Sequence, residues 1–150
     1  MRIVLAEDEA LLREGLRVLL EHVGHDVVAS VSTATELLHA VRRADPAAPP
    51  DIVITDVRMP PGRSDDGLRA AIELRRDHPR LPILLLSQYL GNEYLRRLLD
   101  SAEDDPHSGG VGYLLKDRVA HVQELTQALQ TVACGGVVVD RKVITALMRR

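Results

Sequence analysis

The segment Ile52-Val53-Ile54-Thr55-Asp56, followed by the loop Pro60-Pro61-Gly62, decides the fold class of this chain. Its apolar residues form a continuous run and do not alternate with polar ones, which is typical of a strand covered on both faces. The acid at its end and the Pro/Gly loop indicate where the strand stops. Further runs of this kind lie at residues 3–6, 27–31, 83–86 and 111–115. The sequence therefore predicts five buried strands.

Helical periodicity separates and follows these runs. Apolar residues recur every three or four positions near residues 11–23, 34–41, 68–72, 95–99 and 122–132. Strand and helix thus alternate five times, which predicts a doubly wound α/β domain: a five-stranded parallel sheet with helices on both faces. Gly24 is expected to end the first helix, and Ser32 or Thr33 to cap the second.

The length of 150 residues suits one domain, which we place at residues 1–134. Gly135-Gly136 is expected to break the fifth helix. Beyond it, residues 135–150 are predicted to be a linker: Val137–Val139 is extended or turn-like, and Asp140 is a candidate cap for a short last helix to Arg150. The polar segment 101–110 is predicted to be a surface insertion.

The amino-acid composition argues against several classes of protein. A net charge of −3 gives no sign of a nucleic-acid binder or a membrane-surface protein. The single cysteine, Cys134, excludes an internal disulfide and fits a reducing compartment. No apolar run approaches the roughly 20 residues that span a bilayer, and Glu7 interrupts the first run too early for a signal peptide. We therefore expect a cytoplasmic protein with no membrane partner.

Chemically useful side chains follow four of the predicted strands. Ligands of such folds bind in the crevice beyond the carboxyl ends of the strands. The residues at those ends are Glu7, Asp8 and Glu9 after the first strand, Asp56 after the third, Ser87 after the fourth and Lys116 after the fifth. Alone, each has an ordinary explanation as a cap, a turn residue or a solvated charge. Together at one edge they indicate a site.

The acids of this group predict a metal ion. Clustered carboxylates repel one another unless a cation neutralises them, and oxygen ligands suit a hard divalent ion, of which Mg²⁺ is the expected one. Asp8 and Asp56 are predicted to bind it directly and Glu7 through a bound water. The backbone carbonyl of Arg58 is a candidate for one more oxygen.

Asp56 is the predicted nucleophile, because a carboxylate can attack phosphorus to form an acyl phosphate. The transferred group carries negative charge that positive groups must meet, with Mg²⁺ on one side and Lys116 on the other. Lys116 is one of only two lysines among 19 basic residues, which slightly favours a dedicated role. Ser87 is predicted to hydrogen-bond a phosphoryl oxygen.

At these residues the chain resembles the receiver domains of two-component response regulators, over about residues 1–134. The matching stretches are Ile3-Val4-Leu5-Ala6-Glu7-Asp8-Glu9, Asp56-Val57-Arg58-Met59-Pro60, Asp66-Gly67, Leu86-Ser87 and Gly112-Tyr113-Leu114-Leu115-Lys116-Asp117. The resemblance implies the flavodoxin-like receiver fold, phosphorylation of Asp56 by a sensor histidine kinase, and a Mg²⁺ requirement. It implies a signalling switch that is not an enzyme in the usual sense.

The same resemblance implies how the switch works. Ser87 moves toward the phosphoryl group, Tyr113 reorients inward, and the face of the fourth helix, fifth strand and fifth helix changes shape to bind a partner or a second copy. Residues 112–119 and 135–140 resemble the LuxR/NarL-type subfamily, whose members usually carry a helix-turn-helix domain after the receiver. We expect a homodimer that regulates transcription and meets DNA only through an output domain that lies outside this chain.

Three features depart from the commonest receivers. Gln88 is bulkier than the residue that usually follows the hydroxyl, and the loops 61–65 and 101–110 are longer. None removes a reactive group. The bulk of Gln88 is expected to restrict access to Asp56. The longer loop 101–110 is expected to lie next to the output face and to alter it.

Two other functions fit parts of the pattern. A pseudo-receiver would be an interaction module that never binds phosphate, but such proteins usually lack one of the acids or the lysine found here. A phosphatase of the haloacid dehalogenase type would share the fold class, but its nucleophile follows the first strand. The hypothesis of a dinucleotide-binding domain is rejected, because no Gly-x-Gly-x-x-Gly motif follows the first strand.

Overall fold

The computed structural model describes residues 1–62, 64–88, 92–100 and 108–148. The strands are β1 (Arg2–Ala6), β2 (Asp26–Val31), β3 (Ile52–Asp56), β4 (Ile83–Ser87), β5 (Val111–Leu115) and β6 (Val137–Val139). The helices are α1 (Ala10–His22), α2 (Ala34–Arg42), α3 (Asp66–Asp77), α4 (Asn92–Asp100), α5 (Val122–Ala133) and α6 (Arg141–Met148), with a 3₁₀ turn, η1 (Lys116–Ala120), after β5.

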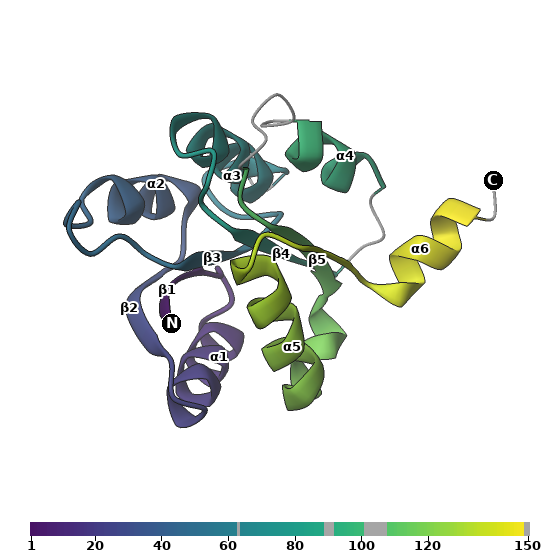
Figure 1. Cartoon of the computed structure of the whole chain (residues 1–150), viewed down its shortest axis with the longest axis horizontal. Coiled ribbons are helices and arrows are strands. Elements are labelled where there is room, and N and C mark those ends of the chain that lie inside the picture. Colours follow the sequence, from purple (N-terminus) through teal and green to yellow (C-terminus); the bar gives the residue numbers. More distant parts are fainter. Residues whose placement is uncertain (63, 89–91, 101–107, 149–150) are drawn as a thin grey trace.

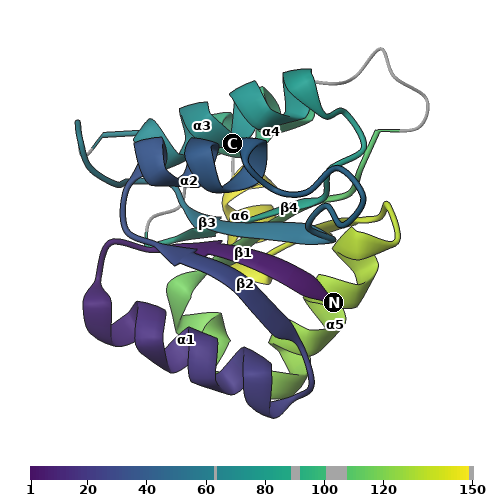
Figure 2. The same cartoon turned by 90° about the vertical axis from the view of Figure 1, so that its left-hand side faces the viewer.

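The strands form one sheet in the order β2-β1-β3-β4-β5-β6, with every neighbouring pair parallel. The three strands β3, β4 and β5 are buried along their whole length, as their unbroken apolar sequences predict. Helices α2, α3 and α4 cover one face, and α1 and α5 cover the other (Figures 1 and 2). The predicted doubly wound α/β architecture is confirmed.

The sheet has six strands, not the predicted five. Residues 137–139 pair in parallel with β5, with Val111 opposite Val137 and Tyr113 opposite Val139. Three residues are too few to show a strand period in sequence, but β5 would otherwise present an unpaired edge. The segment predicted to be a linker is therefore packed on the sheet, and α6 buries Val143 completely.

Two apolar layers enclose the sheet, and successive strand residues enter opposite layers. In β3, Val53 packs in the layer under α2 and α3, while Ile52 and Ile54 pack in the layer under α1 and α5. With no Phe or Trp in the chain, both layers consist mainly of Leu, Val, Ile and Ala. The sheet is thereby held rigid, and its carboxyl edge provides fixed positions for polar side chains.

The predicted helix boundaries agree with local chemistry. Gly24, which follows α1, has a φ of +97°, in the left-handed region that glycine favours at helix ends. Thr33 caps α2: its Oγ1 accepts from the backbone N–H of Glu36 and its hydroxyl donates to the Glu36 carboxylate. Most of the predicted 101–110 insertion, residues 101–107, lies outside the described residues. No helix in the described part of the chain is long and apolar enough to cross a membrane.

Candidate functional site

The carboxyl ends of four strands surround a pocket of about 240 Å³. Its lining consists of Asp8, Glu9, Asp56, Arg58, Ser87, Gln88 and Lys116. These residues end or follow β1, β3, β4 and β5, which are adjacent in the sheet. The structure therefore brings together most of the side chains that the sequence predicts for the site. Glu7 is fully buried and is not among the residues that line the pocket.

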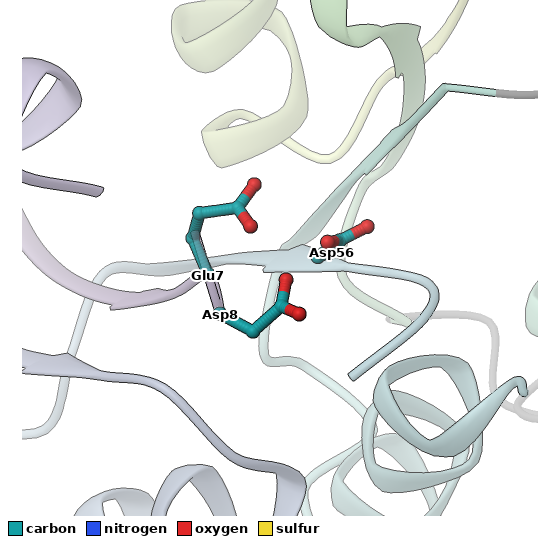
Figure 3. A group of neighbouring side chains, drawn as sticks. All are labelled: Glu7, Asp8 and Asp56. Carbon is teal, nitrogen blue, oxygen red and sulfur yellow. The ribbon is translucent and has the colours of Figure 1, made fainter. Parts of the chain in front are cut away.

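Three carboxylates lie close together in this place. One oxygen each from Glu7, Asp8 and Asp56 lies within 4.8 Å of the others. Figure 3 shows Asp8 directed toward Asp56, with Glu7 beside them. Two of these side chains follow β1 and the third ends β3, so the pairing of β1 with β3 sets their separation. An all-oxygen cluster of this kind has the donor chemistry that a hard divalent cation prefers.

Lys116 bridges two of the acids. Its Nζ lies 2.7 Å from Oε1 of Glu7 and 2.7 Å from Oδ2 of Asp56, and its side chain is only 11% exposed. Lys116 contacts two of the three clustered carboxylates, so the three acids and this lysine together carry an excess of two negative charges when all are ionised. One divalent cation would balance that excess.

Burial and the lysine act in opposite directions on the acids. Desolvation raises the pKa of Glu7 to about 7, although hydrogen bonds from Lys116 and from the backbone N–H of Glu9 lower it. Desolvation also raises the pKa of Asp56 despite the opposing contact with Lys116. Burial lowers the pKa of Lys116, but its bonds to Asp56 and Glu7 outweigh this, so that the pKa is raised and the ammonium stays charged.

Backbone contacts fix the two strand ends that carry the acids. The guanidinium of Arg13 in α1 donates to the carbonyl oxygen of Glu7 at 2.8 Å, and the N–H of Glu9 donates to the Glu7 carboxylate at 3.0 Å. After β3, the N–H of Arg58 lies 3.4 Å from Oδ1 of Asp56. These bonds fix the backbone after both strands and the orientation of the Glu7 and Asp56 carboxylates.

The two remaining predicted site residues differ in depth: one lies at the pocket and the other within the sheet. Ser87 ends β4, is 2% exposed and contributes to the pocket lining. Tyr113 lies one level deeper in β5, fully buried, with Val139 opposite it in β6. The reorientation of Tyr113 on phosphorylation stays a prediction.

Gly67 and Asp66 support the site in a way that sequence reasoning missed. A Cβ on Gly67 would lie 1.8 Å from the carbonyl oxygen of Asp56, so α3 approaches β3 this closely only through glycine. Asp66 is buried and accepts hydrogen bonds from the N–H groups of Gly62 and Ser64. In the sequence, this support is signalled by the adjacent Asp66-Gly67 pair at the start of the third helix.

We expect Gly67→Ala to lower the free energy of unfolding by about 1–3 kcal/mol, because the methyl group must displace the turn after Asp56. Urea unfolding measures the change. Gly15→Ala in α1 is the matched control, since nothing lies within 4 Å of a Cβ there. That substitution should raise stability by about 0.5–1 kcal/mol. Equal effects of the two substitutions would contradict the close approach of α3 to Asp56.

Comparison with known proteins agrees with this geometry. Residues 3–130 match the family described as the response regulator receiver domain. A curated relative, the oxygen regulatory protein NreC of Staphylococcus haemolyticus, is 34% identical over 149 residues, which are 99% of this chain and 62% of that protein. The chain thus spans less than two thirds of the curated relatives it matches.

Two solved structures of the regulator RcsB are similar to this chain over nearly its whole length. The isolated REC domain from Salmonella enterica serovar Typhimurium, with the phosphomimetic BeF₃⁻, has a TM-score of 0.73 and 25% identity, covering 97% of this chain and 96% of that one. A structure described as two RcsB dimers bound to two parallel DNAs has a TM-score of 0.75 and 25% identity, covering 99% of this chain and 68% of that one.

Proposed function

This chain belongs to the response regulator receiver family, and we propose that it is a cytoplasmic switch that accepts a phosphoryl group on Asp56. The observation that supports this most strongly is the bridge from Lys116 to Asp56 and Glu7 beside a third carboxylate, Asp8. A buried acid held by a fixed cation at the mouth of a pocket suits attack on a charged phosphoryl donor. Incubation with a small phosphodonor tests the proposal.

The proposed reaction is a transfer between two groups. An oxygen of the Asp56 carboxylate forms a bond to phosphorus while the bond from phosphorus to the donor breaks. With a sensor histidine kinase as donor, the leaving atom is an imidazole nitrogen, which keeps the electron pair. Lys116 holds the carboxylate and offsets the charge that arrives with the phosphoryl oxygens. Ser87, at the pocket wall, is the proposed hydrogen-bond donor to one of those oxygens. The protein acts on itself, so we do not propose a conventional enzyme.

We further propose Mg²⁺ as the cofactor. The carboxylates of Asp8 and Asp56 are the proposed direct ligands, Glu7 acts through a water, and the backbone carbonyl of Arg58 is a fourth candidate. The fit rests on the donor set, three clustered carboxylates whose negative charge Lys116 offsets only in part. A bound Mg²⁺ would supply positive charge to the phosphoryl oxygens.

Mg²⁺ binding should depend on pH through Glu7. Its pKa of about 7 means that Glu7 carries a proton at pH 6, and this proton competes with the cation. Loss of one proton predicts a Kd about tenfold weaker at pH 6 than at pH 8, which calorimetric titration measures. Glu7→Gln should flatten the profile because the amide does not titrate. An unchanged pH dependence in Glu7→Gln would assign the effect to another group.

The output of the switch is proposed to be dimerisation and transcription regulation. RcsB, which is similar in fold, occurs as dimers bound to DNA. The curated relatives extend beyond the length matched here, which leaves room for a DNA-binding domain. We expect phosphorylation to shift this chain toward a homodimer, and sedimentation velocity with and without phosphodonor measures the shift. A monomer in both states would contradict the proposed output.

A further inference from the structure

The chain segment after Gly136 packs against β5, and Asp140 lies at the joint between β6 and α6. The residue is 3% exposed. Its backbone N–H donates to the carbonyl oxygen of Tyr113 at 2.7 Å, and its own carbonyl oxygen accepts from Val143 at 2.9 Å. Figure 1 shows α6 extending away from the sheet on the side of β5. Asp140 therefore both continues the sheet contact and starts the last helix.

The carboxylate of Asp140 reaches the residues that flank Lys116. Its Oδ2 accepts from the backbone N–H of Leu115 at 3.1 Å and from Nε of Arg118 at 3.1 Å, and the side chain is fully buried. Leu115 is the last residue of β5, and Arg118 lies in η1. One carboxylate thus holds the chain on both sides of the lysine.

Two other contacts hold this turn: Leu115 lies opposite Ser87 of β4 in the sheet, and Val119 of η1 packs partly buried against the core under α1 and α5. The pairing of β5 with β6 ends at Tyr113, so the Leu115 N–H bonds to a side chain and not to a strand. No residue of η1 is buried, and no side chain caps its start. Arg118 also contacts Glu124 at 3.6 Å, but that carboxylate is 54% exposed and the contact is correspondingly weak. The buried Asp140 is the stronger anchor.

We infer that Asp140 is a positioning residue for the phosphoryl-transfer reaction: it fixes the Leu115–Arg118 backbone so that Nζ of Lys116 lies between Glu7 and Asp56. The inference rests on the proposed function of Asp56. Asp140 does not line the pocket. Its Oδ1 also accepts from the backbone N–H of Lys142 at 3.0 Å, at the start of α6, so its route to the site is the turn that carries Lys116. Its removal should change the lysine and leave the three carboxylates in place.

A double-mutant cycle measures whether Asp140 acts through Lys116. The rate constant of phosphoryl uptake from acetyl phosphate is compared at saturating Mg²⁺ in the wild type, Asp140→Ala, Lys116→Ala and the double variant. Asp140→Ala should slow uptake about tenfold or more, because small misplacements of a charged group are costly. In the Lys116→Ala background it should cost less than about twofold.

Selective labelling gives a readout that needs no phosphorylation. The chain has only two lysines, so ¹³Cε-lysine yields two signals, and Lys142→Arg assigns them. Asp140→Ala should move the Lys116 signal. Thr145→Ala is the control, because Thr145 is an exposed residue of α6 that bonds only within its helix. Asp140→Asn keeps an oxygen that accepts from the Leu115 N–H, so it should restore part of the wild-type chemical shift of Lys116. It also provides a second variant for the test if Asp140→Ala does not fold.

The outcomes separate the two proposals. An unmoved Lys116 signal, or equal loss of rate in both lysine backgrounds, overturns the positioning role. A moved signal in a protein whose wild type takes up no phosphoryl group supports the positioning of Lys116 and overturns the proposed function of Asp56.

Discussion

Asp56→Asn is expected to abolish phosphoryl uptake. The amide has nearly the same shape as the carboxylate but is a poor nucleophile, so no acyl phosphate forms. The variant also removes one of the three clustered carboxylates, which should weaken binding of a divalent cation. Phosphate-affinity gel electrophoresis after incubation with acetyl phosphate and Mg²⁺ separates the two forms.

Asp51→Asn is the matched control for this experiment. Asp51 lies just before β3, at the opposite end of the strand from Asp56, and its exposed carboxylate accepts from the N–H of Arg2. The same chemical change there should leave uptake at the wild-type level. Full-stoichiometry labelling of Asp56→Asn would mean that another residue is the phosphoacceptor.

Lys116→Ala is expected to destabilise the metal-free protein by about 3–5 kcal/mol at pH 8, because it strips the cation from two buried carboxylates. Glu7 is fully buried and the side chain of Asp56 is 6% exposed, so water compensates the loss of the ammonium only in part. Urea unfolding followed by circular dichroism measures the change, since the chain has no Trp. Mg²⁺ should restore part of the loss.

The destabilisation should shrink as the pH falls. Without Lys116 the carboxyl pKa values rise further above their unfolded values, so the folded variant binds more protons than the unfolded chain between those values. Stability of the variant therefore increases from pH 8 toward pH 5. Lys142→Ala is the control: the other lysine forms an exposed pair with Asp117, at 3.2 Å, and its loss should cost no more than about 0.5 kcal/mol. Equal costs for the two lysines would contradict the buried bridge.

The fold was predictable because its signals are local. Continuous apolar runs indicate strands covered on both faces, and helical periodicity between them indicates parallel connections. The place of the site followed from topology, since the carboxyl ends of parallel strands meet at one edge. Asp56, Ser87 and Lys116 each directly end or follow such a run, and the structure gathers them at one pocket.

What the sequence could not show depends on contacts between distant residues. Glu7 and Asp8 are neighbours in sequence, yet one is buried beneath Lys116 and the other lines the pocket. The sequence predicts only an extended or turn-like segment at β6, because three valines give no period; the otherwise open edge of β5 explains their pairing. Asp140 was visible as a helix cap, but its bond to Leu115 spans 25 positions.

The most direct test of phosphoryl acceptance at Asp56 is the intact mass of the wild-type protein after incubation with Mg²⁺ and acetyl phosphate, with a chelator in a parallel sample. We predict the gain of one phosphoryl group per chain, lost when Mg²⁺ is removed. No gain, in protein shown to be folded and to bind Mg²⁺, would contradict the account and would favour a receiver that works without phosphorylation.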